Sequence, residues 1–179
     1  MQLGAKHRIA DARRQTYFGR VLEEVAVAVY LRRMTGDELL SDEEWVFRRV
    51  PRESVPIREG RYQIHSEAFN DRWKKPSVDR AAMKSAVEAQ MAPTDGICTL
   101  HVAVVRSITT VVHQGTNKPY QVDVLPRPIK AGNPENEPVN LAHSQVEVDP
   151  EFENASRFKK LKDALSRLAG ERGWVIEPT

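Results

Sequence analysis

The chain has 179 residues, a formal net charge of +2, 40% hydrophobic residues and 29% charged residues. This composition is ordinary for a folded globular protein that is large enough to bury a core of its own. Its single cysteine, Cys98, cannot form an internal disulfide, no apolar run approaches the ~20 residues that cross a bilayer, and the N-terminus lacks the apolar region of a signal peptide. We therefore expect a cytoplasmic protein with no membrane association.

The first predicted element is an amphipathic helix over residues 8–34. Its apolar side chains recur at steps of three and four, which is the spacing of one helix face. Thr35 and Gly36 are expected to end it, because glycine suits a left-handed C-terminal turn. Residues 1–34 carry seven basic and three acidic side chains, so this helix is the most electropositive part of the chain. Its apolar face predicts core packing or, alternatively, docking of another chain.

The next segment alternates short strand and turn signals with one more helix. Alternation predicts a strand from Trp45 to Val50, and Ser66 to Phe69 is typical of a single helical turn or of a tight turn. Ser77 is a good N-cap, which predicts a middle helix from about Val78 to Gln90 with Asp79 in its first turn.

β-Branched, alternating residues then predict the main sheet. We expect strands at Ile97–Arg106, Thr109–His113, Tyr120–Leu125 and Val139–Val148. Residues 126–138 contain four prolines and a glycine, which exclude a regular element there.

The C-terminal segment predicts a helix and a short strand. Asn154 or Ser156 is expected to cap the helix, whose apolar residues are spaced by three and four: Phe158, Leu161, Leu165 and Leu168. Trp174 to Ile176 is expected to add an edge strand. Strands joined by short turns favour an antiparallel sheet, so we predict an α+β fold with about four to five strands packed with three helices. We expect one domain over residues 1–179, composed of the helix at 8–34, a core at 45–148 and a C-terminal helix and tail at 154–176.

Arginine and aromatic residues are densest between Trp45 and Ala81. Guanidinium groups bind carboxylate and phosphate and stack on aromatic rings, so such a block is typical of protein interfaces and of nucleic-acid sites. Residues 42–80 hold nine basic and eight acidic side chains, which favours surface ion pairs and a protein partner over nucleic acid. The candidate binding residues are Arg48, Arg49, Arg52, Phe69, Trp73 and Arg80.

Four short motifs, WVFRRVP, HSEAF, PSVDRA and NLAHSQV, occur in that order between Trp45 and Val148. In this the chain resembles a group of small bacterial proteins that share an aromatic-arginine strand, a Ser-x-Ala-Phe turn, a Ser-Val-Asp-Arg-Ala helix start and a late Asn-x-Ala-His strand. The chain departs from the pattern at Ser144, which follows His143, and in a longer proline-rich loop before Asn140. The resemblance implies a shared fold unit and surface, and it implies no reaction.

Three residues would carry catalysis if the protein is an enzyme: His143, Asp79 and Ser66. In that case Arg48, Arg49 and Arg80 would hold a phosphate or nucleotide, and His143 or Asp79 would transfer a proton. The competing interpretations are structural, with Asp79 beside a helix dipole and His143 hydrogen-bonded to backbone.

His101 and His113 lie on neighbouring predicted strands and could meet across the sheet, with Asp123 near them. However, no metal-ligand spacing and no phosphate-binding glycine loop occurs. We therefore expect no metal and no cofactor. The leading hypothesis is a non-enzymatic accessory or adaptor protein that binds a protein partner in a bacterial multi-protein system. The alternatives are the enzyme described above and a nucleic-acid-binding module.

Overall fold

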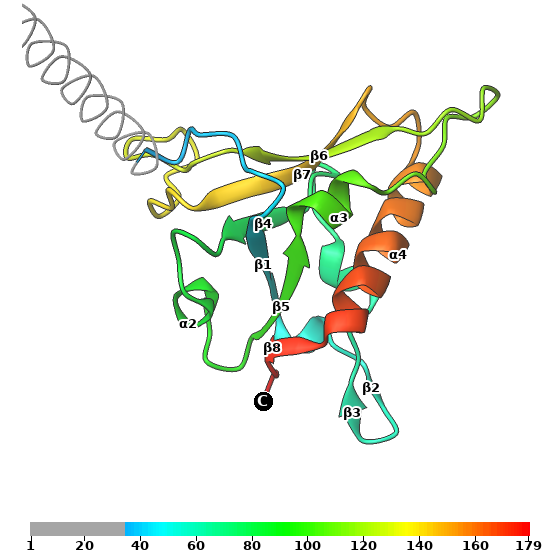
Figure 1. Cartoon of the computed structure of the whole chain (residues 1–179). Helices are drawn as coiled ribbons and strands as arrows, with labels where there is room; N and C mark the ends of the chain where they lie inside the picture. The colour runs from blue at the N-terminus through cyan, green and yellow to red at the C-terminus, as the bar shows by residue number, and fades with distance from the viewer. Residues whose placement is uncertain (1–34) are drawn as a thin grey trace, which may run out of the picture. The chain divides into compact units, whose positions relative to one another are not determined.

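A computed structural model of the protein describes residues 35–179 (Figure 1). Gly36 to Thr179 form one compact unit, and the helix predicted over residues 8–34 lies outside the described residues. Gly36 adopts the left-handed conformation expected of it, with φ of +73°. Within the described residues, no helix is long and apolar enough to cross a membrane.

Six antiparallel strands form the main sheet, in the order β6-β7-β4-β1-β5-β8. Their bounds are β1 Trp45–Val50, β4 Ser77–Arg80, β5 Gly96–His101, β6 Gln121–Pro126, β7 His143–Asp149 and β8 Trp174–Ile176. The α+β class is confirmed in this antiparallel sheet with its helices, but the expected four to five strands were too few. The strands at β1, β6 and β8 lie where alternation predicted them, and the strand expected over Val139–Val148 begins later, at His143.

The middle helix predicted from Val78 to Gln90 is wrong. Ser77 to Arg80 form β4, which pairs with β1 on one side and with β7 on the other. Two hydrogen-bonded neighbours outweigh the local capping signal of Ser77, and Asp79 is therefore not in a helix. A much shorter helix, α2 Ala86–Ala89, follows, and it is capped by Ser85 and Glu88 in a reciprocal capping box.

The long strand predicted over Ile97–Arg106 is also only partly present. β5 ends at His101, and Val102–Arg106 form helix α3, which buries Val102 and Val105 one turn apart. The predicted strand at Thr109–His113 is reduced to an isolated bridge between Val112 and Pro119.

The C-terminal helix α4 spans Ala155–Arg172 and is capped by the side chain of Asn154, which accepts a hydrogen bond from the Arg157 N–H. It buries Leu161 and Leu165 in the core against β-strand side chains that share one face of the sheet, among them Val46, Val50, Val78, Leu100 and Val146. The 3-10 helix η2 Ser66–Phe69, the helical turn predicted at these residues, packs between α4 and β1.

The opposite face of the sheet is packed against by few other elements. Phe47, Arg49 and Asp79 alternate in sequence with the core residues of β1 and β4, so their side chains lie on this second face. Helix α2 contacts β1 and β8 there, and Figure 1 shows α2 and α4 on opposite sides of β1 and β5. A further hairpin, β2 Ile57–Arg58 and β3 Arg61–Tyr62, follows the 3-10 helix η1 Arg52–Ser54 and turns at Glu59 and Gly60.

Candidate functional site

A cleft of about 790 Å³ lies over β1 and β4 on the face of the sheet away from α4. Its floor contains a row of three neighbouring residues, Phe47, Asp79 and His143, which are paired across β1, β4 and β7. One wall comes from α2 and the segment after it, and another comes from residues 129–140. The floor thus combines the arginine-rich block with His143 of β7, and the block also supplies part of the surrounding lining, including Pro51, Glu67 and Asn70.

The cleft exists because β1 and β4 diverge. They pair only at Val46 with Arg80 and at Phe47 with Asp79, although β1 continues to Val50. Beyond Phe47 the gap between them is filled by the side chain of Arg48. Its guanidinium donates to the carbonyl of Ala68 at 2.7 Å, of Ser77 at 2.7 Å and of Asn70 at 3.1 Å.

Arg48 therefore links β1 to η2 and to the start of β4 through hydrogen bonds. Burial of its guanidinium lowers the pKa of Arg48, although nearby Asp71 opposes that shift. The neighbouring thiol of Cys98 is fully buried, and this burial raises the pKa of Cys98 to about 12. Cys98 is part of the packed interior, and Arg48 lines the cleft with its donors already bound to three backbone carbonyls.

Arg49, the next residue, faces the cleft. Its Nη1 lies 3.1 Å from Oδ2 of the buried Asp95, which also accepts from the backbone N–H groups of Met91 and Ala92. The Arg49 side chain is 35% exposed, so the remaining donors of its guanidinium are available to a bound group. Asp95 orients this cation and also fixes the turn after α2.

Asp79 is held from two sides. Its Oδ1 accepts from Nδ2 of Asn140 at 2.7 Å, and its Oδ2 accepts from Nζ of Lys84 at 2.9 Å. Asn140 belongs to the end of the proline-rich loop, where it bridges to Ile129. The carboxylate of Asp79, on the floor of the cleft, is therefore hydrogen-bonded to a residue of each wall.

His143 lies directly opposite Asp79 on β7. Its Nδ1 is 2.6 Å from the carbonyl oxygen of Arg127. Because a carbonyl can only accept, Nδ1 carries the proton, and Nε2 is left with a lone pair when the ring is neutral. Nε2 has no hydrogen-bond partner among residues 35–179.

The other candidate residues lie elsewhere. Arg80 is 2% exposed and points to the core face of β4, where it donates to Glu44 at 2.9 and 3.1 Å and to the carbonyl of Glu38. Phe69 is a core residue with no exposed surface, and Ser66 is buried in η2. Arg80 and Ser66 therefore do not lie in the cleft with Asp79 and His143. In the enzyme hypothesis, Arg80 can no longer bind the anion and Ser66 can no longer act in catalysis.

Two further binding candidates lie outside the cleft. The guanidinium of Arg52 stacks on the ring of Tyr62, 4.6 Å from its centroid. Trp73 is 69% exposed and lines a smaller pocket beside the cleft.

Sequence reasoning missed several residues of the cleft because they come from its walls. Lys84, Asp95 and Asn140 hold the floor residues, while Met91 and Val139 form an apolar rim. The exposed fraction of Met91 is 78% and that of Val139 is 58%. Nothing in the sequence pattern placed Asp95 beside Arg49.

The cleft is balanced in charge. Four cations line it, Arg48, Arg49, Arg72 and Lys84, and so do four carboxylates, Glu67, Asp71, Asp79 and Glu137. Across residues 35–179, no group of three His, Cys, Asp or Glu side chains is placed to hold a metal ion. The arrangement can bind a ligand with both polar and apolar parts.

No model of a known protein family matches the chain, and searches of curated proteins and of solved structures return no match to it. The function must therefore be argued from the site itself.

Proposed function

We propose that the protein is a non-enzymatic binding protein of a bacterial multi-protein system, and that its cleft receives an extended segment of a protein partner. The observation that carries this proposal is the apolar rim over a charge-balanced floor. Met91 and Val139 expose most of their side chains on either wall of the same cleft. Exposed apolar groups that border a polar depression are typical of protein interaction sites.

The size of the cleft favours a short segment. A volume of about 790 Å³ lies in the range of roughly 300–1,000 Å³ that holds a few side chains of a ligand. A whole helix or a folded domain would not fit into it, so the partner inserts only a small number of residues.

The unused donors define the chemistry of that segment. Arg49 has donors left over after its contact with Asp95, and Arg72 forms no ion pair within residues 35–179. Both favour a carboxylate in the partner. The partner segment therefore carries an acidic side chain next to apolar side chains that pack on Met91 and Val139.

Site-specific photo-crosslinking in the native cell tests this proposal. A photoreactive phenylalanine derivative at Met91 or at Val139 is expected to give a discrete adduct with one partner protein. The same group at Ile57, which is 54% exposed on the β2–β3 hairpin, serves as the control and is expected to give no such adduct. Identical adducts from all three positions, or none from Met91 and Val139, would contradict the proposal.

A charge variant tests the role of the carboxylate. Arg49→Gln is expected to weaken the adduct, because it removes the cation that faces the cleft. Arg127→Gln is the matched control, since Arg127 is also ion-paired, to Glu147, and is 50% exposed outside the cleft. An unchanged adduct in Arg49→Gln would remove Arg49 from the interface.

One observation favours a second function, an enzyme that acts on a phosphate-bearing substrate. Arg49, Asp79 and His143 line the same cleft, and the tautomer held by Arg127 leaves Nε2 of His143 available as a base. Asp79 already accepts from Lys84 and Asn140, so proton transfer would fall to His143 and anion binding to Arg49.

Titration with inorganic phosphate separates the two functions. If the cleft is an anion site, the NMR signals of the His143 ring shift with saturation, and the shift is lost in Arg49→Gln. Unchanged His143 signals at millimolar phosphate would exclude this second function.

A further inference from the structure

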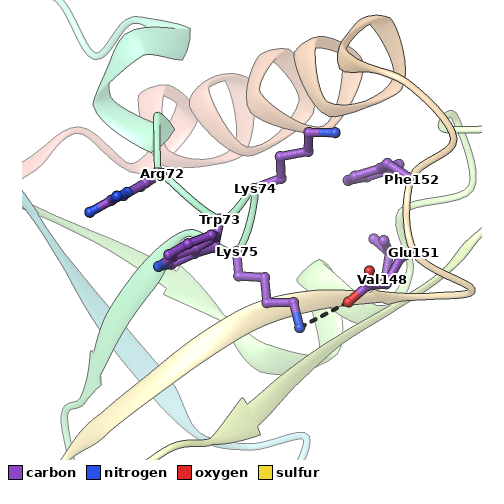
Figure 2. Close-up of a pocket in the computed structure, with 7 residues that line it drawn as sticks. All are labelled: Arg72, Trp73, Lys74, Lys75, Val148, Glu151 and Phe152. Carbon is purple, nitrogen blue, oxygen red and sulfur yellow. Dashed lines mark ion pairs between the residues drawn. The ribbon is translucent and has the colours of Figure 1, made fainter. Parts of the chain in front are cut away.

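A second pocket, of about 240 Å³, lies beside the cleft. It is bounded by the consecutive residues 72–75 and by three residues around the end of β7, Val148, Glu151 and Phe152. Figure 2 shows Trp73 and Phe152 on opposite sides, with the side chain of Lys74 extending toward Phe152 and that of Lys75 extending to Glu151. The pocket therefore combines two aromatic residues with two ammonium groups.

The basic side chains of this pocket are held by a turn. The N–H of Trp73 donates to Oδ1 of Asp71 at 3.1 Å, and the N–H of Lys74 donates to the Asp71 carbonyl at 3.1 Å. Lys74 has a φ of +60°, a conformation that non-glycine residues rarely adopt. Four consecutive residues, 72–75, thereby line one pocket, which an extended strand with alternating side chains would not allow.

Positive charge in this pocket is not fully neutralised. Neither Arg72 nor Lys74 forms an ion pair within residues 35–179. Lys75 lies 3.3 Å from Glu147 and 3.3 Å from Glu151, and the hydrogen bond to Glu151, then that to Glu147, raises the pKa of Lys75. The lysine stays charged at neutral pH, and the pocket has an excess of cations over carboxylates.

The aromatic residues form two different kinds of wall. Trp73 is exposed, and the guanidinium carbon of Arg72 lies 5.0 Å from its ring centroid. Phe152 is fixed by ring contacts to Tyr120 at 5.1 Å and to Phe158 at 6.1 Å. The exposed indole offers a surface on which a flat ring can stack, and the fixed phenyl ring adds an apolar surface to the lining of the pocket.

We propose that this pocket binds a nucleotide, with the base against Trp73 and the phosphate against Lys74. A planar ring is favoured over an aliphatic acid because Trp73 offers an exposed aromatic surface, and a phosphate is favoured because Lys74 forms no ion pair within residues 35–179. The pocket volume suits a single ring system with its phosphate nearby, so one nucleotide occupies it at a time. This site shares Arg72 with the partner cleft, but it does not depend on the function proposed for the cleft.

The same chemistry is present in a free mononucleotide and in a single-stranded nucleic acid, and the test includes both. Adenosine monophosphate binding is followed by tryptophan fluorescence, and binding of a labelled five-nucleotide single strand is followed by anisotropy. Either ligand binding to the full-length protein supports the proposal. Tighter binding of the oligonucleotide assigns the site to a single strand, and equal binding assigns it to the free nucleotide.

Two substitutions test the roles of the residues. Trp73→Ala is expected to weaken binding about tenfold or more, because the stacking surface is lost. Lys74→Gln is expected to weaken binding and to reduce the slope of log affinity against log salt concentration by about 1. The matched controls are Ile57→Ala, another exposed apolar residue, and Lys118→Gln, another exposed lysine, and both should bind as the unaltered protein does.

Three outcomes would overturn the proposal. The first is absence of binding by both ligands at millimolar concentration. The second is binding of inorganic phosphate or of an acidic peptide as tightly as the nucleotide, which would remove the aromatic contribution. The third is an equal loss of binding in Lys118→Gln and Lys74→Gln, which would show unspecific attraction rather than a pocket. Arg72 is left unchanged throughout because it also lines the partner cleft.

Discussion

Arg48 and Arg49 are adjacent in the sequence, yet they have opposite roles because strand side chains alternate between the two faces of a sheet. Arg48 reaches into the gap beside β4 and satisfies three backbone carbonyls. Arg49 faces the cleft and retains free donors. The sequence marked both as binding residues, and it could not separate them because the divergence of β1 from β4 is a tertiary feature.

Replacing Arg48 tests its role as a hydrogen-bonded link between β1, η2 and β4. Arg48→Met has a similar length but no donor, so we expect the free energy of unfolding to fall by about 3 kcal/mol as three carbonyls lose their partner. Arg48→Lys should recover less than half of this loss, since one ammonium cannot span three acceptors as a planar guanidinium does. Urea denaturation measures both, with Arg49→Met as the control that should lose no more than about 1 kcal/mol. Equal losses at the two positions would contradict the assignment.

The Cys98 thiol predicts a pH dependence of stability. Its pKa is raised from 9.0 to about 12 by burial, so the unfolded chain loses the thiol proton at a lower pH than the folded protein does. The stability due to the neutral thiol is therefore complete below pH 9.0 and is lost as pH rises toward about 12, at up to about 1.4 kcal/mol per pH unit.

The measurement compares unfolding free energies of the protein and of Cys98→Ala between pH 8 and 11, because lysines and tyrosines titrate in both. The difference between the two proteins should change with pH in the stated direction. In addition, a thiol reagent at pH 8 should modify Cys98 only after unfolding. Rapid modification of the folded protein would contradict the burial of this residue.

At the scale of secondary structure, elements with a strong hydrophobic periodicity could be predicted. Segments in which a local capping signal competes with strand pairing could not. Helix α4 was predicted because Phe158, Leu161 and Leu165 recur on one face over several turns. The helix expected from Ser77 was wrong because pairing with β1 and β7 decides the conformation of a four-residue segment. The capping signal that the structure uses lies at Ser85 and Glu88, eight residues after Ser77.

The edge strand β8 depends on a glycine in β5. A Cβ at Gly96 would lie 2.6 Å from Cζ3 of Trp174 and 2.9 Å from Cδ of Pro178. We therefore expect Gly96→Ala to displace Trp174, break its 3.1 Å hydrogen bond to the Tyr62 carbonyl, and destabilise the protein by about 1–3 kcal/mol.

Tryptophan fluorescence and urea denaturation check this prediction. Gly170→Ala is the matched control, since nothing lies within 4 Å of a Cβ at Gly170, and it should be neutral or stabilising in the helix. A Gly96→Ala protein as stable as the parent, with unchanged fluorescence, would show that Trp174 does not pack on β5 as described.

At the scale of the whole molecule, the buried residues of the core cluster lie between Leu40 and Ala169 among the residues that the structure describes. The unit from Gly36 to Thr179 is compact by itself, whereas the single domain expected over residues 1–179 stays a prediction. We expect a protein comprising residues 36–179 to fold cooperatively. Circular dichroism and a single two-state urea transition would confirm this, and a broad, non-cooperative transition would show that the preceding residues are needed for folding.

The order of the strands has a consequence for the kinetics of folding. Strand β1 lies in the middle of the sheet, and its ladder with β5 pairs Trp45 with His101. The ladder between β4 and β7 pairs Asp79 with His143. The ladder between β5 and β8 pairs Ile97 with Ile176. Nearly every pair of neighbouring strands is thus separated by a long stretch of chain. Closing such a loop costs conformational entropy before the contacts between the strands can form. The chain should therefore refold slowly for its size, in about milliseconds to seconds rather than microseconds, and stopped-flow fluorescence would measure that time directly.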